Sequence, residues 1–168
     1  MNQPVPCISG QAGSPGAAEA PIVFDLLCRR LAAAWNIGRI TDRLRARVRG
    51  LLPPGTREQD GVLWTSGQDA DAYRSFRTSP IGQVARDAEQ LPAIEIANAM
   101  TWVLSQHAAL AVDDLLRETA RLFGITRLGT GVRESMQQGV QHLAARRDCV
   151  VDGDLGHGPI AGIIAAQS

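Results

Sequence analysis

The chain has 168 residues, of which 45% are hydrophobic and 4% aromatic, so it can form one ordinary domain or two small ones around aliphatic cores. Its 17 basic residues, all Arg, balance 17 acidic residues, and this neutrality weakens the case for a nucleic-acid partner. Because Lys is absent, the chain cannot carry the Gly-Lys-Ser/Thr phosphate-binding loop of a nucleotide-driven motor.

Cysteine usage and hydropathy indicate a cytoplasmic protein. The three Cys residues are scattered and odd in number, which argues against a disulfide framework. No basic start followed by an apolar stretch marks a secretory signal. The longest apolar run, near residues 160–166, is far shorter than the roughly 20 residues that span a bilayer. We therefore expect no membrane partner.

Composition and periodicity divide the chain into two patterned units. The N-terminus is rich in Pro, Gly, Ser and Ala, which is typical of disorder. The central segment is polar and lacks periodicity, as linkers do. The predicted organisation is a disordered N-terminus (1–20), a first unit (21–67), a linker (68–91), a second unit (92–157) and a tail (158–168).

The first unit reads as two helices followed by a hairpin. An amphipathic helix begins near Asp25, a good first-turn residue, and ends at Trp35, where Asn36 can take the left-handed cap conformation. A second helix opens at Thr41, and Asp60-Gly61 before an apolar run predicts a hairpin turn. The apolar stripe of that second helix comprises Ile40, Leu44, Val48 and Leu51.

Two aromatic residues mark the linker. Tyr73 and Phe76 flank arginines, so this stretch can stack on a nucleic-acid backbone. We favour the alternative, in which both aromatic rings pin the linker to the first unit.

The second unit repeats the same pattern and adds a helix ahead of it, at about 92–106. One helix runs from Asp113 to Phe123, where Gly124 can form the cap, and another opens at Thr130. Asp152-Gly153 predicts a hairpin between strands at 148–151 and 154–155. The tail is apolar, small-residue and weakly helical.

The two units are related by an internal repeat at an offset of 88 residues. Residues 113–136 lie over residues 25–48, with Asp113 on Asp25 and Arg133 on Arg45. Helix, short turn, helix and hairpin together describe a winged helix. The sequence therefore predicts a mostly α fold with small β-hairpins, built as tandem winged-helix units.

The first unit has no helix comparable to 92–106 before Pro21. Two explanations remain open: the first helix is missing, as in a truncated or decayed gene, or another chain supplies the packing surface.

The chain resembles the uncharacterised C-terminal domain of bacterial superfamily 1 helicase-like proteins, some of which also carry a very-short-patch-repair-type nuclease. The resemblance covers about residues 21–155 and implies an accessory role beside a DNA-translocating motor in restriction or phage defence. The helicase ATP site and the nuclease are not in this chain. The resemblance rests on residues 95–100, 118–124, 127–129, 132–134 and Leu143, and on Trp35, 43–45 and 63–64 in the first half.

Arginines concentrate in the first unit. Residues 21–67 hold eight Arg against four acidic residues, whereas residues 92–157 hold six Arg against eight. A helix-turn-helix can present such side chains to phosphates or to the major groove; a solvated arginine face is the alternative. The candidate nucleic-acid-binding residues are Arg39, Arg43, Arg45, Arg47, Arg49 and Arg57.

The matched positions of Arg45 and Arg133, and of Asp25 and Asp113, favour a different role for these two arginines. We expect each Arg to form an ion pair with the Asp on the preceding helix. Arg57, Arg146 and Arg147 lie near the hairpins, where phosphate contact is conceivable.

No constellation of catalytic or metal-binding residues stands out. The three His residues show no metal-ligand spacing, and Trp35 and Phe123 are predicted core residues on the apolar seam. We expect no enzymatic activity, no cofactor and no small-molecule substrate. The preferred hypothesis is a nucleic-acid-binding accessory module, most simply for duplex DNA; the alternatives are a protein-interaction module docking on a helicase or nuclease, and a decayed gene fragment.

Overall fold

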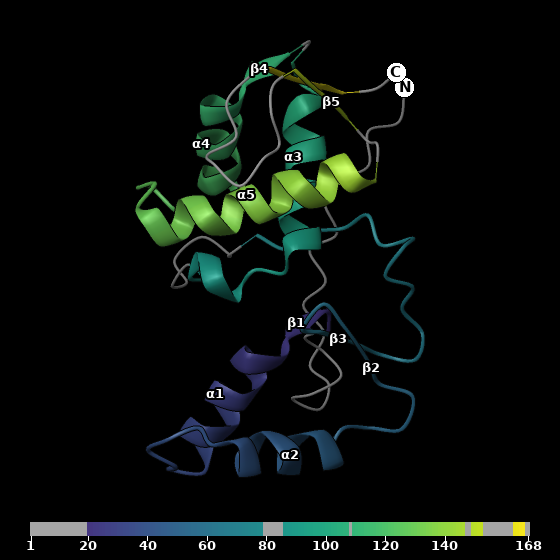
Figure 1. The fold of residues 1–168 in the computed structure, drawn as a ribbon, viewed down its shortest axis with the longest axis vertical. Coiled ribbons are helices and arrows are strands. Elements are labelled where there is room, and N and C mark those ends of the chain that lie inside the picture. Colours follow the sequence, from purple (N-terminus) through teal and green to yellow (C-terminus); the bar gives the residue numbers. More distant parts are fainter. Residues whose placement is uncertain (1–19, 79–85, 108, 147–148, 153–162, 167–168) are drawn as a thin grey trace. The chain divides into compact units, whose positions relative to one another are not determined.

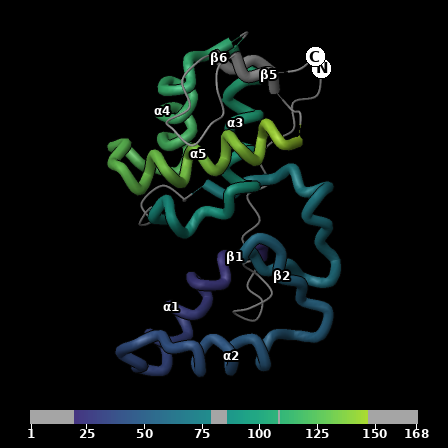
Figure 2. Tube along the Cα trace, viewed as in Figure 1, coloured from purple at the N-terminus to yellow at the C-terminus, as the bar shows by residue number. Residues whose placement is uncertain are grey.

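The computed structural model describes residues 20–78, 86–107, 109–146, 149–152 and 163–166. They form two compact units, and the boundary along the chain lies between Tyr73 and Arg74. The second unit is mostly helical, the first has two helices, and each has a small antiparallel sheet (Figures 1 and 2). We call them the first and the second unit. The predicted disorder of residues 1–19 and the predicted strand at 154–155 lie outside the described residues.

The first unit contains two helices and a three-stranded sheet of order β1-β3-β2. The hairpin turn that the sequence predicted is present, with positive φ at Asp60 (52°) and Gly61 (72°). The elements are β1 (Ile22–Val23), α1 (Phe24–Ala34), α2 (Asp42–Gly50), β2 (Arg57–Gln59) and β3 (Val62–Trp64).

Local chemistry sets the ends of both helices of the first unit. Asn36 lies just beyond α1 with φ of 53°, so the left-handed cap is confirmed. The Thr41 hydroxyl caps α2 by accepting a hydrogen bond from the Leu44 N–H at 3.3 Å. These two residues fix the short turn between the helices.

The second unit repeats this plan with one more α-helix ahead of it. Its sheet has the order β4-β6-β5, which is equivalent to that of the first unit. In Figure 1, α5 lies across α3, its main packing partner. The elements are η1 (Ala88–Gln90), α3 (Ala93–Leu104), β4 (Leu110–Ala111), α4 (Val112–Leu122), α5 (Thr130–Ala145), β5 (Cys149–Asp152) and β6 (Ile163–Ala166).

The offset of 88 residues holds for the structural elements as well as for the sequence. β4 and α4 begin 88 residues after β1 and α1, and α4 ends 88 residues after α1. Gly124, with φ of 77°, occupies the place of Asn36. The helices after the turn differ in length, because α2 has 9 residues and α5 has 16.

The tail and the linker differ from the predictions. Residues 163–166 form β6, the central strand of the second sheet, so the prediction of a weakly helical tail is wrong there. Tyr73 contacts Trp64 edge-on at 5.4 Å between ring centroids, as predicted. Phe76 contacts Phe123 at 6.1 Å in the second unit, so its predicted attachment to the first unit is wrong.

The core of the second unit centres on α3, which packs against both α4 and α5. The two helices α3 and α5 approach each other closely at Gly139, where an added Cβ would lie 2.4 Å from Ile96 Cγ2. Met100, Leu115 and Phe123 are each at most 1% exposed in this core. The apolar contact between α4 and α5 is thus covered by a third helix, α3.

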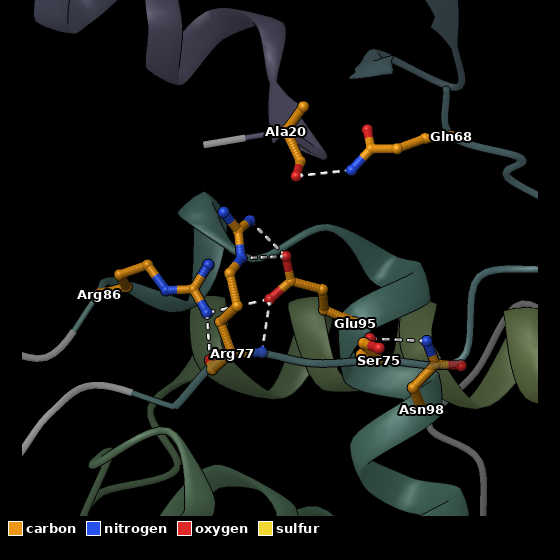
Figure 3. A network of polar contacts seen from close by, with 7 residues as sticks. All are labelled: Ala20, Gln68, Ser75, Arg77, Arg86, Glu95 and Asn98. Atoms are coloured by element: carbon orange, nitrogen blue, oxygen red, sulfur yellow. Dashed lines mark hydrogen bonds and ion pairs between the residues drawn. The ribbon is translucent and has the colours of Figure 1, made fainter. Parts of the chain in front are cut away.

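A buried carboxylate, Glu95, fastens the preceding irregular segment to α3 (Figure 3). It accepts hydrogen bonds from the Arg77 N–H (3.2 Å), Arg77 Nε (3.0 Å) and Arg86 Nη2 (3.0 Å). The Asn98 amide donates to the Ser75 carbonyl at 2.8 Å. Burying a carboxylate is costly unless it is paired, so these contacts hold residues 75–77 and 86 in the second unit.

We predict that Glu95→Gln lowers the free energy of unfolding by about 2 kcal/mol, because two arginines would lose their buried counter-charge. The value is below that for a wholly buried pair, since the Arg77 side chain is 35% exposed. Chemical denaturation measures the loss, and Glu89→Gln, at an exposed position, is the control. Equal stability of the two variants would contradict this role of Glu95.

Candidate nucleic-acid interface

The repeated Asp–Arg pairs join the two motif helices in both units. Arg45 Nε lies 3.3 Å from Asp25 Oδ1, and Arg45 Nη1 lies 3.3 Å from Asp42 Oδ1. At the equivalent place in the second unit, Arg133 Nη1 donates to Asp113 Oδ1. The predicted ion pairs are confirmed. Arg45 therefore has a structural partner within its own unit.

Arg49 is held by the hairpin and by an aromatic ring. Its Nε and Nη2 donate to the two carboxylate oxygens of Glu58 at 3.0 and 3.1 Å, a bidentate arrangement. Its guanidinium carbon lies 4.2 Å from the centroid of the Phe24 ring. The hydrogen bonds from Arg49 hold the pKa of Glu58 below its ordinary value of 4.5. This arginine fastens α2 to β2.

Arg57 has a backbone partner. Its Nη2 donates to the carbonyl oxygen of Gln68, whose own amide donates to the Ala20 carbonyl at 2.9 Å. Three of the six candidate arginines, Arg45, Arg49 and Arg57, thus have intramolecular partners.

The other three candidates, Arg39, Arg43 and Arg47, are exposed. None of them forms an ion pair with a carboxylate of the described residues. Arg43 and Arg47 are four residues apart, so they share one side of α2. At 100° per residue, Arg45 and Arg49 lie on the other side of the buried Leu44–Val48 stripe. On one side of α2, Arg45 and Arg49 are paired with acidic residues of the same unit. On the other side, Arg43 and Arg47 have no acidic partner among the described residues.

The equivalent side of α5 has a different chemistry. Gly131 and Ser135 replace Arg43 and Arg47 at the offset of 88, and Ser135 is buried at 8% exposure. They line a cavity of about 280 Å³ together with Glu89, Leu91, Glu134 and Gln138. The two glutamates would repel a phosphate, so this side of α5 is unsuited to nucleic acid.

Trp35 and Leu51 are more exposed to solvent than the sequence predicted. Phe123 is 1% exposed, as expected for a core residue, whereas Trp35, its counterpart, is 44% exposed. Leu51, assigned to the apolar stripe of α2, is 59% exposed. The prediction of Trp35 as core is wrong because, within residues 20–73, no third helix accompanies α1 and α2.

The described residues offer no metal centre and no membrane span. Among them, no group of three or more His, Cys, Asp and Glu side chains is placed to hold a metal ion. None of their helices combines the length and the apolarity needed to cross a bilayer.

One comparison with known proteins gives a match. A family model described as a protein of unknown function (DUF3320) matches residues 17–46. The match includes α1, the turn and the start of α2, with Asp25, Trp35 and Arg43. No curated protein and no solved structure matches the chain. Over this stretch, the chain is therefore similar to an uncharacterised domain.

We predict that the Glu58 carboxyl titrates below its ordinary pKa of 4.5 and moves back toward that value in Arg49→Gln. Because the folded-state pKa is lowered, the pair stabilises the fold above pH 4.5 and is lost as the pH falls through the lowered pKa. Carboxyl NMR titration measures both proteins. An unchanged titration in the variant would show that Arg49 does not engage Glu58.

Proposed function

We propose that the protein is a non-enzymatic, tandem winged-helix module that binds nucleic acid through its first unit. The order strand, helix, turn, helix and antiparallel strand pair in both units supports this assignment, as does the equivalent strand order of the two sheets. In this reading, α2 and α5 are the second helices of the helix-turn-helix, and β2–β3 and β5–β6 are the wings.

The observation that carries the proposal is the exposed arginine side of α2. Arg43 and Arg47 have no acidic partner among the described residues. Arg39, which precedes the helix, is likewise exposed and has no acidic partner among them. Guanidinium groups pair bidentately with phosphate oxygens. Three such groups would contact the backbone of a duplex and position α2 on it without reading its sequence.

The internally paired arginines would have a supporting role. Arg45 and Arg49 hold α2 against α1 and β2, which keeps the exposed arginines in place. To bind a phosphate, Arg45 and Arg49 would have to break their contacts with carboxylates. Arg57 would have to break its hydrogen bond to the Gln68 carbonyl. Direct binding therefore falls mainly to Arg39, Arg43 and Arg47.

Duplex DNA is the ligand that a winged helix accommodates most simply. The resemblance to the C-terminal domain of helicase-like proteins supports a role for this module as an accessory to a motor or nuclease partner in phage defence. The second unit, with its acidic cavity beside α5, would act as a scaffold.

We predict that Arg43→Gln/Arg47→Gln weakens DNA binding and reduces the slope of log K against log salt concentration by about 2, because each phosphate contact contributes roughly 0.9. The measurement is a titration of a labelled DNA duplex at several salt concentrations. The control is Arg117→Gln/Arg121→Gln, which removes the same charge from exposed arginines of α4.

The two double variants separate a specific interface from general charge. If the protein binds no duplex at low salt, the proposal is wrong. It is equally wrong if both double variants lose the same affinity, because binding would then follow net charge and not the α2 surface.

A further inference from the structure

The second unit serves as an internal template for the first. In the second unit, α3 packs over both α4 and α5. Four positions along their seam are fully or almost fully buried there: Leu115, Thr119, Phe123 and Val140. A single helix thus removes this seam from water.

The same positions of the first unit are apolar but only partly covered. Subtracting 88 residues gives Leu27, Leu31, Trp35 and Leu52; the three leucines are partly buried and Trp35 is 44% exposed. Leu51 occupies the place of Gly139 and is 59% exposed. Leu27 and Leu31 lie on α1, Trp35 and Leu51 follow the last residues of α1 and α2, and Leu52 comes next. Exposed apolar residues grouped in this way mark an interaction surface.

We propose that this surface, formed by Leu27, Leu31, Trp35, Leu51 and Leu52, is a docking surface for an amphipathic α-helix of a partner protein that is preceded by an acidic segment. The helix would take the place that α3 has in the second unit. A second copy of the chain cannot offer its own α3 without opening its second unit, because nine of the helix's residues are buried there.

Charge indicates the acidic character of the segment ahead of this helix. In the second unit, the segment before α3 brings Glu89 beside Gly131, where an added Cβ would lie 3.7 Å from Glu89 Oε1. The first-unit counterpart of Gly131 is Arg43, and Arg47 lies one turn further along α2. In the first unit, a carboxylate at the position equivalent to that of Glu89 would lie beside these exposed arginines. Because Arg43 and Arg47 also carry the proposed nucleic-acid contacts, the helix and the duplex should compete.

Leu51 adds a constraint on size. Its counterpart, Gly139, leaves room for Ile96 of α3. A leucine side chain fills that room, so the docked helix must present a small residue opposite Leu51.

A synthetic peptide provides the probe. It comprises residues 86–107, which hold α3 and Glu89, with Ile96→Ala to fit Leu51 and Glu95→Ala to remove a carboxylate that needs Arg77 and Arg86. Fluorescence anisotropy of the labelled peptide against the full chain measures binding. We expect saturable binding that weakens with salt.

Matched variants locate the site. Trp35→Ser and Leu51→Ser should each weaken peptide binding by about tenfold or more, as for a central apolar contact. Trp102→Ser is the control, because Trp102 is 43% exposed, almost as much as Trp35, but lies in the second unit. Melting curves should show all three variants folded, since the side chains are exposed.

The remaining outcomes contradict the proposal. It fails if the full chain binds no peptide, or if Trp35→Ser binds as the parent does. It also fails if binding appears only after removal of residues 1–19, which would make them the occupant, or if the free chain self-associates through Trp35. A different result, absence of DNA binding with retained peptide binding, would support the docking surface and contradict only the proposed nucleic-acid function.

Discussion

The fold depends on one constraint: two helices joined by a short turn have an apolar seam that needs a cover. In the second unit α3 provides it, and Phe123, Leu115 and Val140 are buried as a result. Within residues 20–73 no third helix does so, and Trp35 and Leu51 stay exposed. The same architecture thus yields a closed unit and an open one, and the open unit is also the arginine-rich one.

Charge placement follows from how each unit holds its helices together. Arg45 and Arg133 pair with the Asp at the start of the preceding motif helix, so these arginines stabilise the motif. Arg49 adds a second fastening to the hairpin. The arginines on the other side of α2, Arg43 and Arg47, are not needed for this purpose. Their exposure, in a protein of zero net charge, is what suggests a ligand with negative charge.

Local rules and the repeat made much of the fold predictable. The positive φ angles at Asn36 and Gly61 and the Asp–Arg pair all follow from residue type and the offset of 88. Long-range contacts did not follow. β6 pairs with a strand more than 50 residues earlier, and the partners of Glu95 come from an irregular segment without periodicity. Trp35 is exposed because residues 20–73 contain no third helix, and a stripe of apolar residues in the sequence does not show whether a covering helix is present.

Hydrogen–deuterium exchange on the free full-length chain tests the central claim, that the first unit is an open copy of the second, most directly. Exchange reports local opening, which is easier where fewer apolar contacts hold a helix. The account predicts that backbone amides in α1 and α2 exchange faster than those at the matched positions, 88 residues later, in α4 and α5. Equal protection of the matched positions would mean that the seam of the first unit is already covered, and would contradict the account.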